Sequence, residues 1–179
     1  MNTRDPLSGD MFRDQPECYP SGMPKILVTG MSGTGKSTVL EKLGERGHRV
    51  VDTDTDEWCR WVTEEDGSTD WIWREEAIAK LLADHEQGML FVSGCKSNQA
   101  DFYDSFDHVV LLSAPVDVML SRIASRTNNP YGKSDQERQM ILEHQRFIEP
   151  LLRKSATVEI VTTAPVDDVV RELEKLSAG

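Results

Sequence analysis

The chain has 179 residues, 38% hydrophobic content and a net charge of −11 at pH 7, which suits one soluble domain with a substantial core. A negative charge of this size repels phosphate backbones, so we expect no nucleic-acid partner. No apolar run approaches the roughly 20 residues that cross a bilayer and no secretory leader is visible, so we expect a cytoplasmic protein that works without a membrane.

The chain begins with a segment that we expect to be flexible. Residues 1–22 hold three prolines, two glycines and no periodic apolar pattern. The apolar run at 25–29 (KILVT) is typical of a buried parallel strand. A helix is predicted over 36–46 with Gly47 as its end, followed by a strand over 48–51 that leads into acidic residues.

Helices and strands continue to alternate through the middle of the chain. We predict a helix over 71–86 and strands over 89–93 and 108–112. Pro115 is expected to open a helix that ends near residue 126.

The C-terminal part of the chain completes the pattern. The run SDQE at 134–137 fits a capping box and starts a long helix, which Pro150 kinks or divides. A fifth strand is predicted over 157–161, and Pro165 opens the last helix. Strands separated by helices predict an α/β domain over 23–179 with a parallel sheet and right-handed crossovers.

The glycine-rich stretch at 30–37 (GMSGTGKS) matches the Walker A pattern at every fixed position, and it lies between a predicted strand and a predicted helix. Its backbone N–H groups and the helix N-terminus are suited to bind phosphate oxygens. We expect Lys36 to contact the β- and γ-phosphates, Ser37 to bind Mg²⁺ and Thr38 to assist at the α-phosphate. The alternative is a chance glycine-rich turn. The residues predicted to bind ATP in this loop are Gly30, Ser32, Gly33, Thr34, Gly35, Lys36, Ser37 and Thr38.

Two acidic residues follow the second predicted strand. Asp52 and Asp54 alternate in an extended chain, so their side chains point the same way at the edge where parallel sheets bind ligands. One carboxylate can hold Mg²⁺ through water while the other accepts the proton of a substrate hydroxyl. The alternative is a helix N-cap followed by a solvated acidic loop, because Asp56 and Glu57 continue the acidic run.

Residues 56–74 combine aromatic and acidic side chains. A wall of tryptophans surrounded by acids would suit a sugar, a cyclitol, a nucleoside or a cationic hydroxylated ligand, and it disfavours a polyanion. The alternative is that the tryptophans are core residues and the acids are solvated; we expect one or two tryptophans to line the cleft. The residues concerned are Trp58, Trp61, Trp71, Trp73, Glu64, Glu65 and Asp66.

The cysteines and histidines carry no recognisable pattern. The three cysteines are scattered and the four histidines lack metal-ligand spacing, so neither a disulfide framework nor a zinc site is predicted. The cysteines are Cys18, Cys59 and Cys95.

With this P-loop and the Asp52-Thr53-Asp54 sequence at a strand end, the chain resembles P-loop small-molecule kinases, and within them most of all the shikimate kinase and gluconate kinase families. The resemblance covers about residues 24–177. It implies a five-stranded parallel sheet of order 2-3-1-4-5, flanking helices and a mobile lid at about 122–137. It also implies ATP and Mg²⁺ as cofactors, and transfer of the ATP γ-phosphoryl group to a hydroxyl of a small metabolite.

The same resemblance suggests roles for individual residues. It implies that Asp52 lies near Mg²⁺ and that Asp54 contacts the acceptor hydroxyl. Arg122 would lie against adenine, Arg126 would reach the transferring phosphoryl group, and the turn at Pro165 would border adenine. The alternatives are solvated helix arginines and simple packing.

The sequence departs from shikimate kinases where those enzymes grip the substrate carboxylate. The arginine expected just before the Glu-Pro pair at 149–150 is replaced by Ile148, although Arg74 matches a second such arginine. The glycine cluster expected after the third strand has become SGCK at 93–96. Lys96 and Asn98 follow that strand at the ligand-binding edge, and we expect them to hydrogen-bond the acceptor. Loss of one bidentate clamp would remove about 1.5–3 kcal/mol, so shikimate is not the expected acceptor.

The sequence therefore predicts a cytoplasmic ATP:alcohol phosphotransferase, a monomer or dimer, whose partner is a small hydroxylated substrate such as a sugar or cyclitol. Its catalytic residues would be Lys36, Asp54 and Arg126, and Arg74 and Lys96 would join Asp54 at the substrate. One alternative is a nucleoside or nucleotide kinase, which needs a basic acceptor pocket. Another is a non-kinase ATP-binding switch, which would turn over ATP without an acceptor.

Overall fold

The computed structural model describes residues 23–127 and 129–176, so the predicted extension at 1–22 lies outside the described residues. A five-stranded sheet forms the centre of this part of the chain, and all its strand pairs are parallel. Its order, β2-β5-β1-β6-β7, is the order 2-3-1-4-5 of the five predicted strands, which is thereby confirmed. The strands are β1 (Lys25–Thr29), β2 (Arg49–Asp52), β5 (Leu90–Ser93), β6 (His108–Ser113) and β7 (Val158–Val161).

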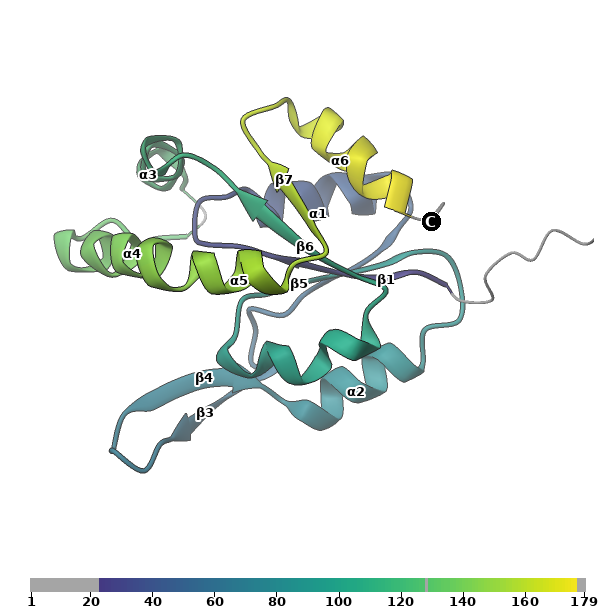
Figure 1. The fold of residues 1–179 in the computed structure, drawn as a ribbon, viewed down its shortest axis with the longest axis horizontal. Helices are drawn as coiled ribbons and strands as arrows, with labels where there is room; N and C mark the ends of the chain where they lie inside the picture. Colours follow the sequence, from purple (N-terminus) through teal and green to yellow (C-terminus); the bar gives the residue numbers. More distant parts are fainter. Residues whose placement is uncertain (1–22, 128, 177–179) are drawn as a thin grey trace, which may run out of the picture.

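Helices cover both faces of this sheet (Figure 1), as expected for strands linked by crossovers. Helices α1 and α6 lie on one side, and α2 lies on the other together with the 3₁₀ segment η1. None of the helices among the described residues is long and apolar enough to cross a membrane. The helices are α1 (Lys36–Glu45), α2 (Glu75–Ala83), η1 (Ser97–Ser105), α3 (Val116–Ser125), α4 (Asp135–Phe147), α5 (Glu149–Ser155) and α6 (Val166–Lys175).

The core is divided by the alternation of side chains along the central strands. Ile26 and Val28 of β1 pack with α1 and α6, whereas Leu27 faces the opposite way toward α2 and η1. A third apolar cluster joins α3, α4 and α5 around Met119 and Ile141. The carboxyl ends of β1, β2 and β5 therefore meet at one edge of a rigid sheet, where ligands of such folds bind.

The predicted helix at 71–86 is wrong in its first part. A β-hairpin of β3 (Cys59–Thr63) and β4 (Thr69–Trp73) precedes α2, which begins at Glu75. The segment Thr69–Trp73 has β-branched and aromatic residues that favour a strand, and an Asp-Gly turn at Gly67, with φ of 84°, closes the hairpin. The apolar spacing of the following helix extended the predicted helix too far back.

Two expectations about helix ends are confirmed. Ser134 caps α4, and Ser134 and Glu137 form the reciprocal capping box. Pro150 lies at the start of α5, so it divides the predicted long helix into α4 and α5.

Candidate active site

The loop between β1 and α1 has the backbone shape of a phosphate cradle. Gly30 has φ of 147°, and a Cβ there would lie 2.3 Å from the carbonyl oxygen of Leu112. Gly35 is the N-cap of α1 and has φ of 97°, in the left-handed region that favours glycine. Thr34 is buried beneath the loop, and its Oγ1 donates to the carbonyl of Met31 at 2.9 Å. The loop is thus held open around the N-terminus of α1, where an anion is favoured.

Lys36 folds back over this cradle. Its Nζ donates to the carbonyl oxygens of Gly30 at 2.6 Å and Met31 at 3.1 Å. Burial lowers the pKa of Lys36, although the nearby Cys95, Asp54 and Asp52 act in the opposite direction. The Lys36 ammonium is partly desolvated and bound to loop carbonyls, so it can replace these contacts with stronger ones to phosphate oxygens.

A cavity of about 400 Å³ opens beside the cradle. One end is formed by the loop residues and the first turn of α1, and the other by Thr162, Ala164, Val166 and Val169. The polar end suits phosphates and the more apolar end suits a base, so the whole cavity has the character of a nucleotide site. Pro165 itself does not line the cavity, although its neighbours Ala164 and Val166 do.

Arg122 of α3 lies between these two ends. Its Nη1 donates to Thr162 Oγ1 at 2.9 Å, and its Nη2 donates to the Thr162 carbonyl at 2.5 Å. The Thr162 hydroxyl donates in turn to the carbonyl of Thr34 at 2.7 Å. Arg122 therefore ties the loop after β7 to the phosphate loop, and its guanidinium lines the cavity at the same time.

Arg126, just after α3, also lines the nucleotide cavity. Its Nη2 donates to the carbonyl of Tyr131 at 2.6 Å, while its buried Nε has no hydrogen-bond partner among the described residues. Burial lowers the pKa of Arg126. A guanidinium with unused donors beside a phosphate cradle can bind a phosphoryl oxygen.

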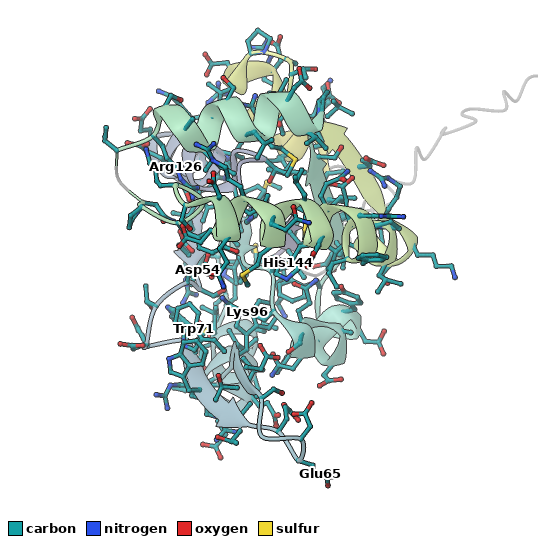
Figure 2. The ribbon with its side chains drawn as sticks, turned by 90° about the vertical axis from the view of Figure 1, so that its left-hand side faces the viewer. Asp54, Glu65, Trp71, Lys96, Arg126 and His144 are labelled. Atoms are coloured by element: carbon teal, nitrogen blue, oxygen red, sulfur yellow. The ribbon has the colours of Figure 1, made fainter. Side chains whose placement is uncertain are left out.

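A second cavity, of about 460 Å³, adjoins the first. Its lining is drawn from the phosphate loop, the loop after β2, the hairpin, the segment after β5, and α4 with the loop before it. Figure 2 shows Asp54, Lys96, Trp71 and His144 gathered between α4 and the hairpin. The lining residues are Gly30, Met31, Ser32, Lys36, Asp54, Trp71, Cys95, Lys96, Asn129, Tyr131, Ile141 and His144.

The two cavities meet at four residues that line both. These residues are Ser32, Lys36, Asp54 and Asn129. The terminal phosphate of a nucleotide that reached this junction would face a molecule bound in the second cavity. The volume of the second cavity is within the roughly 300–1,000 Å³ typical of small-molecule sites.

Asp54 is held at the junction by an ion pair. Lys96 Nζ lies 2.6 Å from Asp54 Oδ1 and 4.1 Å from the centroid of the Trp71 ring. The Lys96 side chain is 9% exposed, whereas that of Asp54 is 52% exposed. Asp54 is therefore accessible from the cavity, while the cation that fixes it is enclosed.

The hairpin that carries Trp71 is fastened to the segment after β5. The Trp73 N–H donates to Asn98 Oδ1 at 3.0 Å, and Asn98 Nδ2 donates to the Trp73 carbonyl at 3.1 Å. Ser97 also donates to Asp70. These contacts hold Trp71 and Lys96 side by side although they are 25 positions apart in the sequence.

Some of the predicted site residues lie elsewhere. Arg74 is exposed and lines neither cavity; its Nε donates to the carbonyls of Asp56 and Cys59 at 3.0 Å each. Asp52 also lines neither cavity, but its Oδ1 accepts the N–H of Asp54 at 3.1 Å, and its charge acts on Lys36. Asp52 thus lies beside the junction, and Arg74 is the N-cap of α2, directly after the hairpin.

The expectation that one or two tryptophans line the cleft is confirmed by Trp71, whereas the acidic residues at 64–66 do not line the second cavity. Trp71 alone of the four tryptophans lines the second cavity, and Trp73 is fully buried in the core. Trp61 is 68% exposed and stacks on Trp71, with 6.0 Å between ring centroids. Glu65 lies at the far end of the hairpin in Figure 2, so the acidic run at 64–66 does not surround the cavity.

Several lining residues carried no signal in the sequence. His144 is a single histidine on an amphipathic helix, and Asn129 and Tyr131 belong to the loop before α4. They reach the site only because α4 packs against α3 through Ile141 and Ile123. Neither spacing nor residue type could have identified them before the packing of α4 was known.

The donor set fits magnesium bound with a nucleotide rather than a metal held by protein alone. No group of three or more His, Cys, Asp or Glu side chains suited to a metal occurs in residues 23–127 and 129–176. Mg²⁺ in such sites is held through one or two protein oxygens, phosphates and waters. Ser37, which lines the nucleotide cavity, and Asp52 are the oxygens available for that role.

Comparison with known proteins places this arrangement in a family. The AAA domain family matches residues 26–143. No curated protein is similar enough to this chain to count as a match.

Solved structures share the fold. A shikimate kinase from Acinetobacter baumannii, in complex with shikimate, has a TM-score of 0.61 at 22% identity, over 86% of this chain and 92% of the other. A shikimate kinase from Bacteroides thetaiotaomicron has a TM-score of 0.61 at 16% identity, over 88% and 100%. A gluconokinase from Sinorhizobium meliloti 1021 has a TM-score of 0.53 at 20% identity, over 87% and 91%. The expected likeness to these kinases is confirmed for the fold.

Proposed function

This chain belongs to the AAA domain family, and on that premise we propose that it is an ATP-dependent phosphotransferase that moves the γ-phosphoryl group to a hydroxyl of a small metabolite. One observation carries the proposal: the nucleotide cavity and the second cavity meet at Ser32, Lys36, Asp54 and Asn129. A nucleotide-binding switch needs no such second cavity. A nucleotide kinase needs arginines to bind its acceptor phosphate, and no arginine is among the residues that line the second cavity.

The proposed reaction uses the loop to hold ATP and the junction to position the acceptor. The loop amides and Lys36 bind the phosphates, and Arg122 lies along the nucleotide. Mg²⁺ on Ser37, with Asp52 nearby, would neutralise charge on the phosphates. The acceptor enters the second cavity with one hydroxyl directed at Asp54, so that its oxygen faces the γ-phosphorus.

Transfer then needs little covalent chemistry from the protein. The acceptor oxygen forms a bond to the γ-phosphorus, the bond from that phosphorus to the bridging oxygen breaks, and ADP leaves with the electron pair. Asp54 accepts the hydroxyl proton. Arg126 exchanges the Tyr131 carbonyl for an oxygen of the transferring group, where charge spreads in the transition state.

The proposal is tested by measuring ADP release with a panel of hydroxylated metabolites, with the Lys36→Ala variant as the blank. We expect ADP release to depend on an acceptor, and Asp54→Ala to reduce transfer by at least about 10²-fold while ATP binding is retained, because general-base positioning contributes 10²–10⁴. Transfer by Asp54→Ala at the wild-type rate would remove Asp54 from the mechanism. ADP release that no acceptor increases would instead support a nucleotide-hydrolysing switch.

A further inference from the structure

The charges around the second cavity identify the class of molecule that it accepts. Building on the phosphotransferase function, we propose that the acceptor is an uncharged polyhydroxylated molecule, and that the Lys96–Asp54 ion pair excludes carboxylated acceptors. The pair also excludes cationic acceptors, because the carboxylate that would attract them is already neutralised.

Three fixed charges occur among the residues that line the second cavity. They are Lys36, Asp54 and Lys96, and no arginine is among the lining residues. Lys36 is engaged by the loop carbonyls and faces the phosphate side. Asp54 and Lys96 lie 2.6 Å apart and cancel each other. The acceptor side of the cavity is therefore close to neutral, although it contains ionised groups.

Lys96 is poorly placed to leave Asp54 for a ligand. Its side chain is 9% exposed and its ammonium packs on the face of Trp71. Trp71 also stacks with Trp61, with 26° between the rings, and the hairpin is fastened by Asn98. A ligand carboxylate that drew Lys96 away would also leave the Asp54 carboxylate unpaired next to a second negative charge.

The remaining polar groups suit hydroxyls. A hydroxyl both donates and accepts, whereas a carboxylate only accepts. The lining offers groups of both kinds. Asn129 Oδ1 accepts the Tyr131 N–H at 2.9 Å, which leaves its Nδ2 to donate, and Ser32, Tyr131 and His144 have side chains that can donate or accept. Asp54 Oδ1 contacts Lys96, which leaves Oδ2 to accept from the reacting hydroxyl.

Binding of matched probes tests the proposal without any need for catalysis. Each pair shares its carbon skeleton and differs in one charge: D-glucitol with D-gluconate, and methyl shikimate with shikimate. Calorimetric titration into the full chain saturated with Mg·ADP gives the two dissociation constants of each pair. We expect the uncharged member to bind at least about tenfold more tightly, the effect of one charge-assisted contact. Equal or tighter binding of the carboxylates, or no binding of any uncharged polyol in a wider panel, would overturn the proposal.

Variants of the ion pair show whether it sets this selectivity. Asp54→Asn keeps the shape of the side chain but frees the Lys96 ammonium, so gluconate should gain about tenfold in affinity relative to glucitol. The double variant Asp54→Asn/Lys96→Met should lose that gain; each variant is titrated at Mg·ADP concentrations that saturate it. Thermal unfolding confirms that both variants are folded. An unchanged glucitol-to-gluconate ratio in Asp54→Asn would show that the pair does not exclude carboxylates.

These outcomes separate the acceptor class from the reaction. Selective binding of uncharged polyols with no acceptor-dependent ADP release would sink the phosphotransferase proposal and keep the binding proposal. Acceptor-dependent transfer to carboxylated molecules would do the reverse.

Discussion

The thiols of Cys59 and Cys95 differ in their exposure. Cys59 is buried, its Sγ contacts the carbonyl of Thr53 at 3.0 Å, and burial raises its pKa to about 11. Cys95 is half-buried and lines the second cavity. Because only a thiolate attacks alkylating reagents, about one Cys59 thiol in a thousand would be reactive at pH 8 even if reagent could reach it.

We therefore expect iodoacetamide to modify Cys95 in the native protein and to leave Cys59 unmodified until the chain unfolds. Saturating acceptor should slow Cys95 modification, because the ligand fills the cavity that Cys95 lines. Peptide mapping by mass spectrometry follows each cysteine separately. The Cys95→Ser variant is the control, and rapid native modification of Cys59 would contradict the burial of this residue.

Single residues of the site differ in how far the sequence could predict them. Lys36 and the glycines of the loop follow from a motif, because phosphate binding needs a fixed local geometry. Asp54 follows from its place at a strand end. His144 and Asn129 do not follow from any local pattern, since tertiary packing alone brings α4 to the cavity. Arg74 matches a position in the resembled family, yet its side chain binds the carbonyls of Asp56 and Cys59 and lines neither cavity, because a matched position does not fix where a long side chain makes its hydrogen bonds.

Among the elements, the β3–β4 hairpin contributes Trp71 to the lining of the second cavity. Asn98 binds both the N–H and the carbonyl of Trp73, and so acts as a substitute for a neighbouring strand. The hairpin has no other strand partner among the described residues. A two-stranded hairpin is marginal alone, so its position depends on this side chain and on the packing of Trp73.

We expect Asn98→Ala to loosen the hairpin and to lower the free energy of unfolding by about 1–3 kcal/mol, since two backbone groups lose their partners. The KM for the acceptor should rise while the KM for ATP stays unchanged, because Trp71 belongs to the acceptor cavity. Amide hydrogen exchange over residues 59–73 should accelerate. Asn98→Asp, which can still accept from the Trp73 N–H, should give an intermediate effect; equal changes in both KM values would contradict the separation of the cavities.

The local sequence patterns explain which elements could be predicted. The five sheet strands and their order were predictable because buried parallel strands are short apolar runs between helices, and because the P-loop strand takes the central position in the resembled families. The hairpin was missed because Trp71 and Ile72 fit the apolar spacing of the helix that follows them. The Asp-Gly turn at 66–67 was the local signal that would have separated the two elements.

For the molecule as a whole, the charge of Lys36 in the phosphate cradle lowers the free energy of unfolding of the nucleotide-free protein. Lys36 carries its charge into a poorly hydrated position, and burial lowers its pKa below the ordinary 10.5. Between that lowered pKa and 10.5 the unfolded chain holds a proton that the folded chain has lost. This group therefore makes stability increase with pH across that window, and below it the burial of the charge is a constant cost. Bound phosphate would remove this cost, because a nearby negative charge stabilises the charged form of Lys36.

We accordingly expect Lys36→Met to raise the unfolding free energy of the nucleotide-free protein by about 1 kcal/mol at pH 7, or about 2–4 °C in Tm, since an apolar side chain replaces a buried charge. The loop carbonyls that Lys36 contacts line an open cavity and can bind water instead. Mg·ADP should no longer raise the Tm of the variant. Lys42→Met, a partly exposed position on the same helix that lines neither cavity, is the matched control and should change stability by less than about 0.5 kcal/mol and keep the response to Mg·ADP. A Lys36→Met protein that is less stable than wild type, yet still stabilised by Mg·ADP, would show that this lysine supports the fold rather than the phosphates.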